Sequence, residues 1–160
     1  IVGGDPFDPG DLEVEDGDPL EIVGYASDFN VFDVGSDVSI ATGMPAWPLK
    51  VFGHYLVNTE ADDDDTGFQF GAGIGNSKDP GDINFTYAYQ RLETDAVLST
   101  FSDSDFGFDG GTNREGHILQ LSYMFMKNLQ FVSTAWFVEP IDGGNDNLQK
   151  RWQVDMIAKF

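Results

Sequence analysis

Carboxylates are the groups in this sequence whose type and spacing come nearest to known chemistry. Asp103, Asp105 and Asp109 lie in one glycine-containing stretch, and residues 62–65 are four consecutive aspartates. Calcium takes roughly six to eight oxygen ligands, so several carboxylates on one flexible loop could hold it. The stretch from 103 to 109 nevertheless lacks the full spacing and the terminal glutamate of an EF-hand loop. The sequence therefore predicts solvated acidic loops and no cofactor, with a weak calcium site at Asp103, Asp105 and Asp109 as the alternative.

No motif brings together the catalytic groups of an enzyme. The opening letters IVGG resemble the mature start of trypsin-like proteases, but neither His54 nor His117 lies in a serine-and-aspartate context. Glu93 and Asp95 could be a general acid–base pair, yet an arginine precedes them on the same face, which favours a surface charge cluster. The absence of cysteine excludes thiol nucleophiles, zinc–thiolate sites and disulfides. The sequence therefore predicts a protein that is not an enzyme.

Charge and hydropathy exclude two further classes. The chain carries 28 Asp and Glu against 8 Lys and Arg, a formal net charge of -20, and such a field repels nucleic acid. No run of 18 apolar residues occurs, so no transmembrane helix is predicted. The mean hydropathy of -0.25 does not argue against a membrane barrel, because only every second residue of a barrel strand faces lipid.

The clearest pattern is an alternation of apolar and polar residues. Near the C-terminus, Trp152, Val154 and Met156 fall on one face while Gln153 and Asp155 fall on the other, as in a strand with one apolar side. The segment 129–138 is more ambiguous, because both of its faces are apolar in places. Strands of about ten residues are long enough to cross a bilayer at a tilt. The seven predicted strands are 32–40, 49–58, 68–75, 83–90, 119–125, 129–138 and 151–160.

The connections between these strands fall into two classes. Short ones, 42–47, 76–82 and 127–128, alternate along the chain with longer acidic ones, 59–65, 102–115 and 139–147. Four lysines lie at the short-turn end: Lys50, Lys78, Lys127 and Lys159. Short turns at one end and long loops at the other are typical of outer-membrane barrels, whose long loops lie outside the cell. A soluble sandwich has no reason to segregate its connections, so the sequence predicts an all-β fold, an antiparallel transmembrane β-barrel.

The first thirty residues differ from the rest. Residues 1–30 are rich in aspartate, glutamate and proline and are predicted to be an acidic external loop or a disordered segment, with the barrel strands in 31–160. Leu20–Ala26 could instead be an eighth strand, which would place the N-terminus in the periplasm. Seven strands cannot close with the even count usual in single-chain bacterial barrels, so we expect further strands before Ile1. An eight-stranded closed barrel, filled by side chains, is the alternative.

Several stretches resemble the bacterial "putative porin" family, over approximately residues 28–160. They are Met44–Asn58 (MPAWPLKVFGHYLVN), Thr86–Asp105 (TYAYQRLETDAVLSTFSDSD), Asp109–His117 (DGGTNREGH), Leu121–Asn128 (LSYMFMKN) and Arg151–Phe160. Members of that family are outer-membrane porin-like barrels longer than this chain. The resemblance therefore implies that the chain is the C-terminal part of such a barrel. The terminal Phe160 also resembles the signal read by the outer-membrane insertion machinery.

On this interpretation the protein is a channel for passive diffusion of ions and small polar solutes. Acidic loops at its mouth would concentrate cations. The alternative is a non-conducting structural barrel that displays acidic loops or sheaths a partner protein. The expected partners are outer-membrane lipid, the diffusing solutes, and either the remaining barrel strands or, by analogy with other porins, a homotrimer. The predicted pore-lining residues are Lys50, Gln69, Asn84, Gln90, Gln120, Gln153, Asp155 and Lys159.

Two further groups of residues have positions that a barrel explains. The glycines at 71, 73 and 75 alternate with apolar residues and are interpreted as small lumen-facing positions. Aromatic side chains near strand ends suit the lipid–water interface, where amphipathic rings are enriched. The predicted interface aromatics are Trp47, Tyr55, Tyr87, Tyr89, Trp136, Trp152 and Phe160.

Overall fold

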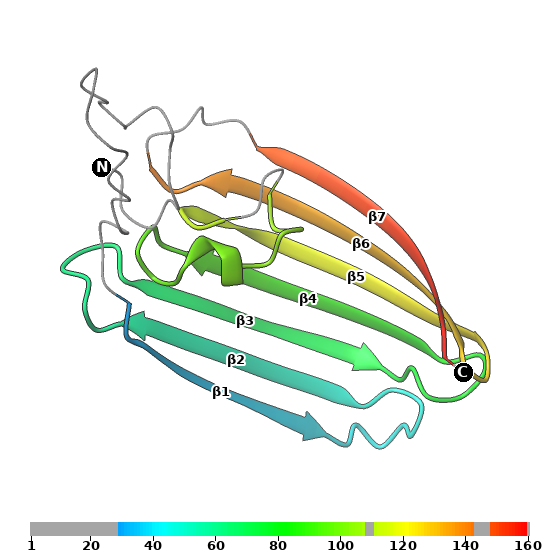
Figure 1. The fold of residues 1–160 in the computed structure, drawn as a ribbon. Helices are drawn as coiled ribbons and strands as arrows, with labels where there is room; N and C mark the ends of the chain where they lie inside the picture. Colours follow the sequence, from blue (N-terminus) through cyan, green and yellow to red (C-terminus); the bar gives the residue numbers. More distant parts are fainter. Residues whose placement is uncertain (1–28, 108–110, 143–147, 160) are drawn as a thin grey trace.

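The computed structural model describes residues 29–107, 111–142 and 148–159. These residues form one antiparallel sheet in which each strand pairs with the next one along the chain (Figure 1). The only helical element among them is a 3-10 turn at Ser99–Phe101, and they contain no helix with the length and hydropathy needed to span a bilayer. The strands are β1 (Val31–Ile40), β2 (Leu49–Asn58), β3 (Thr66–Gly75), β4 (Ile83–Leu92), β5 (Arg114–Met126), β6 (Leu129–Pro140) and β7 (Gln149–Ala158).

The seven strands lie where the alternation predicts them. The main difference is β5, which begins at Arg114 rather than at Leu119. The additional residues, Arg114–Ile118, pair in register with β4 and β6. A sequence of Arg, Glu, Gly and His has little β-propensity, and here pairing on both sides overrides that weak preference.

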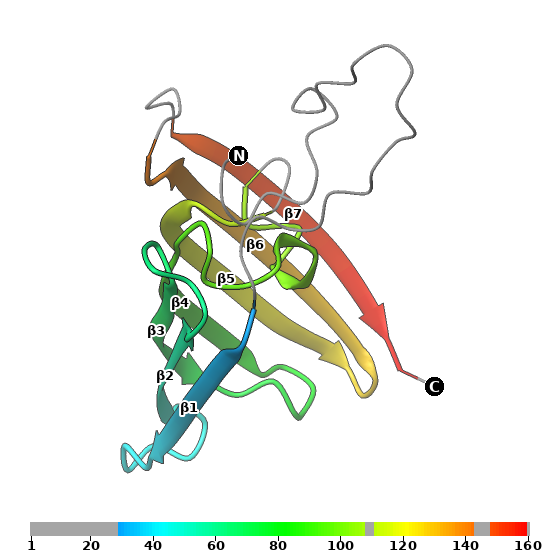
Figure 2. The same ribbon diagram turned by 60° about the vertical axis from the view of Figure 1, so that its left-hand side comes forward.

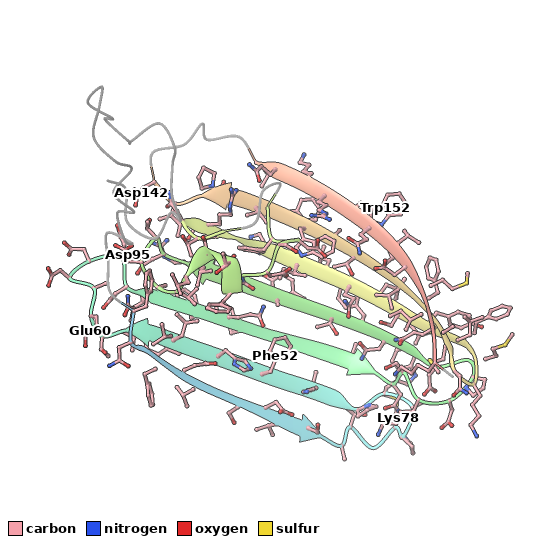
Figure 3. All side chains as sticks on the ribbon, viewed as in Figure 1. Phe52, Glu60, Lys78, Asp95, Asp142 and Trp152 are labelled. Carbon is pink, nitrogen blue, oxygen red and sulfur yellow. The ribbon has the colours of Figure 1, made fainter. Side chains whose placement is uncertain are left out.

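The sheet has two distinct ends (Figure 1). The connections 41–48, 76–82 and 127–128 lie at one end. At the other end lie 59–65 and the described parts of the β4–β5 and β6–β7 connections, residues 93–107, 111–113, 141–142 and 148. We call them the turn end and the loop end. Figure 3 shows Lys78 at the turn end and Glu60, Asp95 and Asp142 at the loop end. The loop 59–65 is no longer than the turn 76–82, so length distinguishes the two ends chiefly through 93–113.

The tightest connection is the two-residue turn between β5 and β6. Asn128 has a φ of 74°, in the left-handed region that asparagine tolerates better than most residues. The register shifts by one residue between Met124 and Met126, and a bulge of this kind increases local twist. The turn 76–82 is tied to the same place, since Gly81 N donates to Met124 O and Met124 N donates to Asp82 O.

The described sheet is open. β1 pairs only with β2, and β7 pairs only with β6. Because every neighbouring pair is antiparallel, β1 and β7 run in the same direction. The sheet is thus a portion of a barrel wall and not a closed barrel. The alternative eighth strand, Leu20–Ala26, lies outside the described residues, as does most of the predicted segment 1–30.

Candidate functional site

Alternate residues of each strand face opposite sides of the sheet. We call the side on which the 93–107 segment lies the inner face, and the opposite side the outer face. Figure 2 shows the sheet curled around this segment. Because side chains alternate with a period of two and opposed residues share a face, the register assigns every strand residue to one side.

The outer face is apolar and exposed. Trp152 and Met156 leave 75% and 73% of their surface uncovered, and Trp152 points away from the sheet in Figure 3. The indole N–H of Trp152 donates to Ser133 Oγ at 2.8 Å, so its polar atom is satisfied within the sheet. Apolar surfaces of this extent mark contact with a membrane or another molecule. The other large exposed apolar residues of this face are Phe32, Val34, Val38, Ile40, Val51, Tyr55, Phe70, Ile74, Ile83, Phe85, Tyr87, Leu121, Tyr123, Phe125, Phe131 and Val154.

A polar network borders the outer face at the loop end. Arg91 lies 2.6 Å from a carboxylate oxygen of Glu115 and 3.2 Å from one of Glu93. The Tyr89 hydroxyl donates to Glu115 at 2.9 Å, and Glu139 stands directly opposite Glu115 in the β5–β6 ladder. Charged groups therefore follow the apolar rows where the strands approach their loops.

Glu93 joins this network to the neighbouring strand. Its carboxylate accepts hydrogen bonds from the backbone amide and the hydroxyl of Thr66. Burial acts to raise the pKa of Glu93, but the bonds from Thr66 and the pairing with Arg91 outweigh it, and the pKa lies below its usual value. Glu93 is thereby held as an ionised group between Arg91 and Thr66, whereas Asp95, predicted to share a surface charge cluster with it, has a buried carboxylate oxygen.

Aromatic rings form a continuous row beside this network. Phe70 and Tyr89 have ring centroids 5.5 Å apart, and Tyr89 and His117 have centroids 5.2 Å apart. The Tyr87 hydroxyl lies 2.9 Å from His117 Nδ1. Together with Glu115, these β4 and β5 rings line a shallow hollow on the outer face. A row of rings with polar atoms along one border has the amphipathic character of a membrane-interface girdle.

The aromatic residues predicted to lie at the lipid–water interface do not all lie on the outer face. Tyr55, Tyr87, Tyr89 and Trp152 lie on the outer face, and Trp47 lies half-exposed in the turn before β2. Trp136 does not fit the prediction, because it is buried on the inner face. Phe160 lies outside the described residues.

The inner face carries a polar row across the middle of the sheet. Thr86, Gln120, Thr134 and Gln153 follow one another through the registers of β4 to β7. Gln120 Nε2 donates to Thr134 Oγ1 at 3.3 Å, and Gln153 Nε2 donates to the Asp155 carboxylate at 3.0 and 3.1 Å. Such uncharged donors and acceptors suit contact with water and polar solutes.

Ionisable groups of the inner face form close pairs. Lys50 Nζ lies 3.3 Å from Asp37, and His54 Nδ1 lies 3.9 Å from Asp33, all on β1 and β2. On β7, Arg151 lies 2.8 Å from Asp105, which belongs to the loop between β4 and β5. Each of these pairs is at least one-third exposed.

The predicted pore-lining residues fall on this face with one exception. Lys50, Gln69, Asn84, Gln90, Gln120, Gln153 and Asp155 all have inner-face positions. Gln69 Nε2 donates to Gln90 Oε1 at 2.8 Å. Lys159 follows the end of β7 and is exposed. Their role in lining a pore stays a prediction.

The sequence interpretation missed the position of the β4–β5 loop, of which residues 93–107 lie on the inner face. The sequence predicts an external, solvated loop at 102–115, yet Phe106 is 1% exposed and packs with Trp136 and Val138, beside Ile118, against the inner face. The signal was present in the sequence, because two phenylalanines within DSDFGF interrupt an otherwise polar acidic stretch.

The predicted calcium ligands are placed only in part. The Asp103 carboxylate accepts a hydrogen bond from Asp105 N, and the Asp105 carboxylate pairs with Arg151. Asp109 lies outside the described residues. Within 29–107, 111–142 and 148–159, no three acidic or histidine side chains gather as a metal site would require.

Comparisons with known proteins agree with this geometry. The model of a protein family described as "Putative porin" matches residues 9–160 of the chain. No curated protein and no solved structure matches it.

Proposed function

We propose, since the chain belongs to the "putative porin" family, that its sheet forms part of the wall of an outer-membrane channel for passive diffusion of ions and small polar solutes. The family supports a membrane-embedded, non-enzymatic barrel. Water and solutes would pass along the inner face of the sheet.

The observation that carries it is the difference between the two faces of one sheet. Trp152, Val154 and Met156 on the outer side of β7 alternate with Arg151, Gln153 and Asp155 on its inner side. A bilayer offers no hydrogen-bond partners, so polar side chains collect where water remains, and apolar ones face the acyl chains. A water-filled lumen bounded by the inner face satisfies both groups at once.

The two ends support the orientation proposed here. Lysines border the turn end, and the loops 59–65 and 93–107 carry many carboxylates. We propose that the loop end faces the cell exterior, as long loops do in outer-membrane barrels. Carboxylates at that mouth would raise the local concentration of cations.

The inward position of the long loop favours a second candidate, a non-conducting barrel. A segment that packs on the inner wall takes up space in which solutes would move, and a lumen filled in this way would leave a structural or partner-binding role. Conductance separates the two candidates.

The test is single-channel recording of the full-length protein in planar bilayers. We expect ohmic steps with weak cation preference. A charge change at Gln120→Glu on the inner face should alter ion selectivity, whereas Leu121→Ala, the next residue and on the outer face, should not. If the wild-type protein inserts but gives no steps, the channel proposal is wrong and the non-conducting barrel is favoured.

A further inference from the structure

The segment 93–107 lies across the inner face and is held there at two places. We infer that it is a latched constriction whose closed position depends on the Asp105–Arg151 pair and on Phe106, and that Arg151 sets ion selectivity when the latch opens. This inference rests on the proposed channel function, because a constriction has meaning only where solutes pass.

The first attachment is the root of the segment. Asn58 Nδ2 donates to Asp95 O at 2.9 Å, and Asp95 N donates to Asp64 O at 2.8 Å. Asn58 and Ala96 are both fully buried at this junction. The root is thereby fixed to β2 and to the 59–65 loop, independently of what the tip does.

The second attachment is polar and lies on β7. One Arg151 nitrogen stands 2.8 Å from the Asp105 carboxylate, and another donates weakly to Ser104 O at 3.5 Å. The guanidinium also lies 5.8 Å from the centre of the Trp136 ring, within the range of a cation–π contact. The Arg151 side chain therefore contacts both Trp136 of the inner wall and residues 103–107, which we call the tip of the segment.

The third contribution is apolar. Phe106 fills the space between the loop and Trp136 and Val138. The gap bordered by Gly107, Trp136 and Arg151 has no room for a water molecule. Gly107 has a φ of 99°, and a Cβ there would meet the Arg114 side chain. Phe106 and Gly107 therefore lie in direct contact with the inner wall.

The latch also determines which charges of the wall are balanced. In the closed state Lys50 is neutralised by Asp37 and Arg151 by Asp105, while the Asp155 carboxylate accepts hydrogen bonds from the neutral Gln153. With Lys50 and Arg151 paired and the Asp155 carboxylate beside a neutral partner, this part of the wall favours cations. Loss of Asp105 would leave the Arg151 charge facing the lumen.

The experiment uses the full-length protein in planar bilayers with three latch variants, Arg151→Gln, Asp105→Asn and Phe106→Ala. Each should raise single-channel conductance by roughly 1.5-fold or more, because each releases the tip into the solvent and widens the path. The reversal potentials should shift in opposite directions. Asp105→Asn should make the channel more selective for anions, and Arg151→Gln should make it more selective for cations. A shared gain in conductance with opposite selectivity shifts is the signature of the latch.

The matched control is Lys127→Gln, which removes one positive charge in an exposed turn at the far end of the sheet. It should leave conductance unchanged. A second readout does not need conduction: hydrogen exchange of peptides covering residues 99–107 should quicken in Arg151→Gln but not in Lys127→Gln.

The outcomes separate the latch from the channel. Unchanged conductance and exchange in all three latch variants of a conducting protein would overturn the latch. A different outcome is a wild-type protein that conducts no ions while the hydrogen exchange of residues 99–107 still depends on Arg151. That result would show that the channel proposal and the constriction are wrong and that the docked loop is a structural element.

Discussion

Gly71 of β3 stands directly opposite Phe52 of β2, and the Phe52 ring occupies the space where a side chain at position 71 would begin. A Cβ there would also press on the carbonyl oxygen of Tyr87, on the far side of the strand. Backbone cannot move aside as a flexible side chain can. The sequence predicts the inner glycines of β3 to be small lumen-facing positions, and at Gly71 the adjoining space is filled by the ring of Phe52.

The first prediction follows from this contact. Gly71→Ala should lower the free energy of unfolding by about 1–3 kcal/mol, the usual range for overpacking. Guanidinium unfolding of the protein in lipid vesicles measures it. Gly53→Ala is the control, because a Cβ at 53 has nothing nearer than Gln69 O at 3.8 Å. Equal effects at the two positions would contradict the packing described for Phe52.

The second prediction concerns the two glutamates that face each other at the loop end. Glu115 binds Arg91 and Tyr89, whereas Glu139 has no ion-pair partner among the described residues. Glu115→Gln should cost about 1 kcal/mol, allowing for the partial exposure of the pair. Glu139→Gln should be neutral or slightly stabilising, because it removes a like charge opposite Glu115. The same unfolding assay compares them, and a larger loss for Glu139→Gln would argue against the network.

The third prediction is a pH dependence in the turn 76–82. The Asp82 carboxylate accepts hydrogen bonds from the backbone N–H groups of Asp79 and Lys78, at 2.9 and 3.0 Å, and these lower its pKa. Because the folded pKa is depressed, the stabilisation is present above the unfolded pKa and is lost as pH falls through the folded pKa.

NMR titration of the Lys78 and Asp79 amides checks this. Both amide shifts should hold constant down to about pH 4 and then move together at a midpoint below the ordinary value for aspartate. Asp82→Asn should abolish the shared transition. A midpoint at or above the ordinary value would show that these hydrogen bonds do not favour the ionised carboxylate.

The strands could be predicted because each has one apolar face and one polar face. The alternation is clearest in β7, where Trp152, Val154 and Met156 face outwards. It is weakest in β6, and the structure supplies the reason: Trp136 and Val138 are inner-face residues, yet they are apolar because Phe106 covers them. The loop that packs on the inner wall changes the pattern of the strand beneath it.

The inner loop itself could not be located from sequence. A local pattern does not specify that Asp105 meets Arg151, which lies far along the chain, because that pairing depends on how β5, β6 and β7 lie together. The acidic composition of the loop favoured solvation, and the single Phe106 contact decides against it at the tip.

The central claim is that the outer face of the sheet contacts lipid and the inner face contacts water. Cysteine scanning along β4 tests it most directly, because this sequence has no cysteine to interfere. Single cysteines are placed at Asn84 and Thr86 on the inner face and at Ile83 and Phe85 on the outer face. The full-length protein in liposomes is then treated with a charged, water-soluble maleimide. We expect rapid labelling at positions 84 and 86 and little at 83 and 85; equal labelling at all four positions, or the reverse order, would contradict the account.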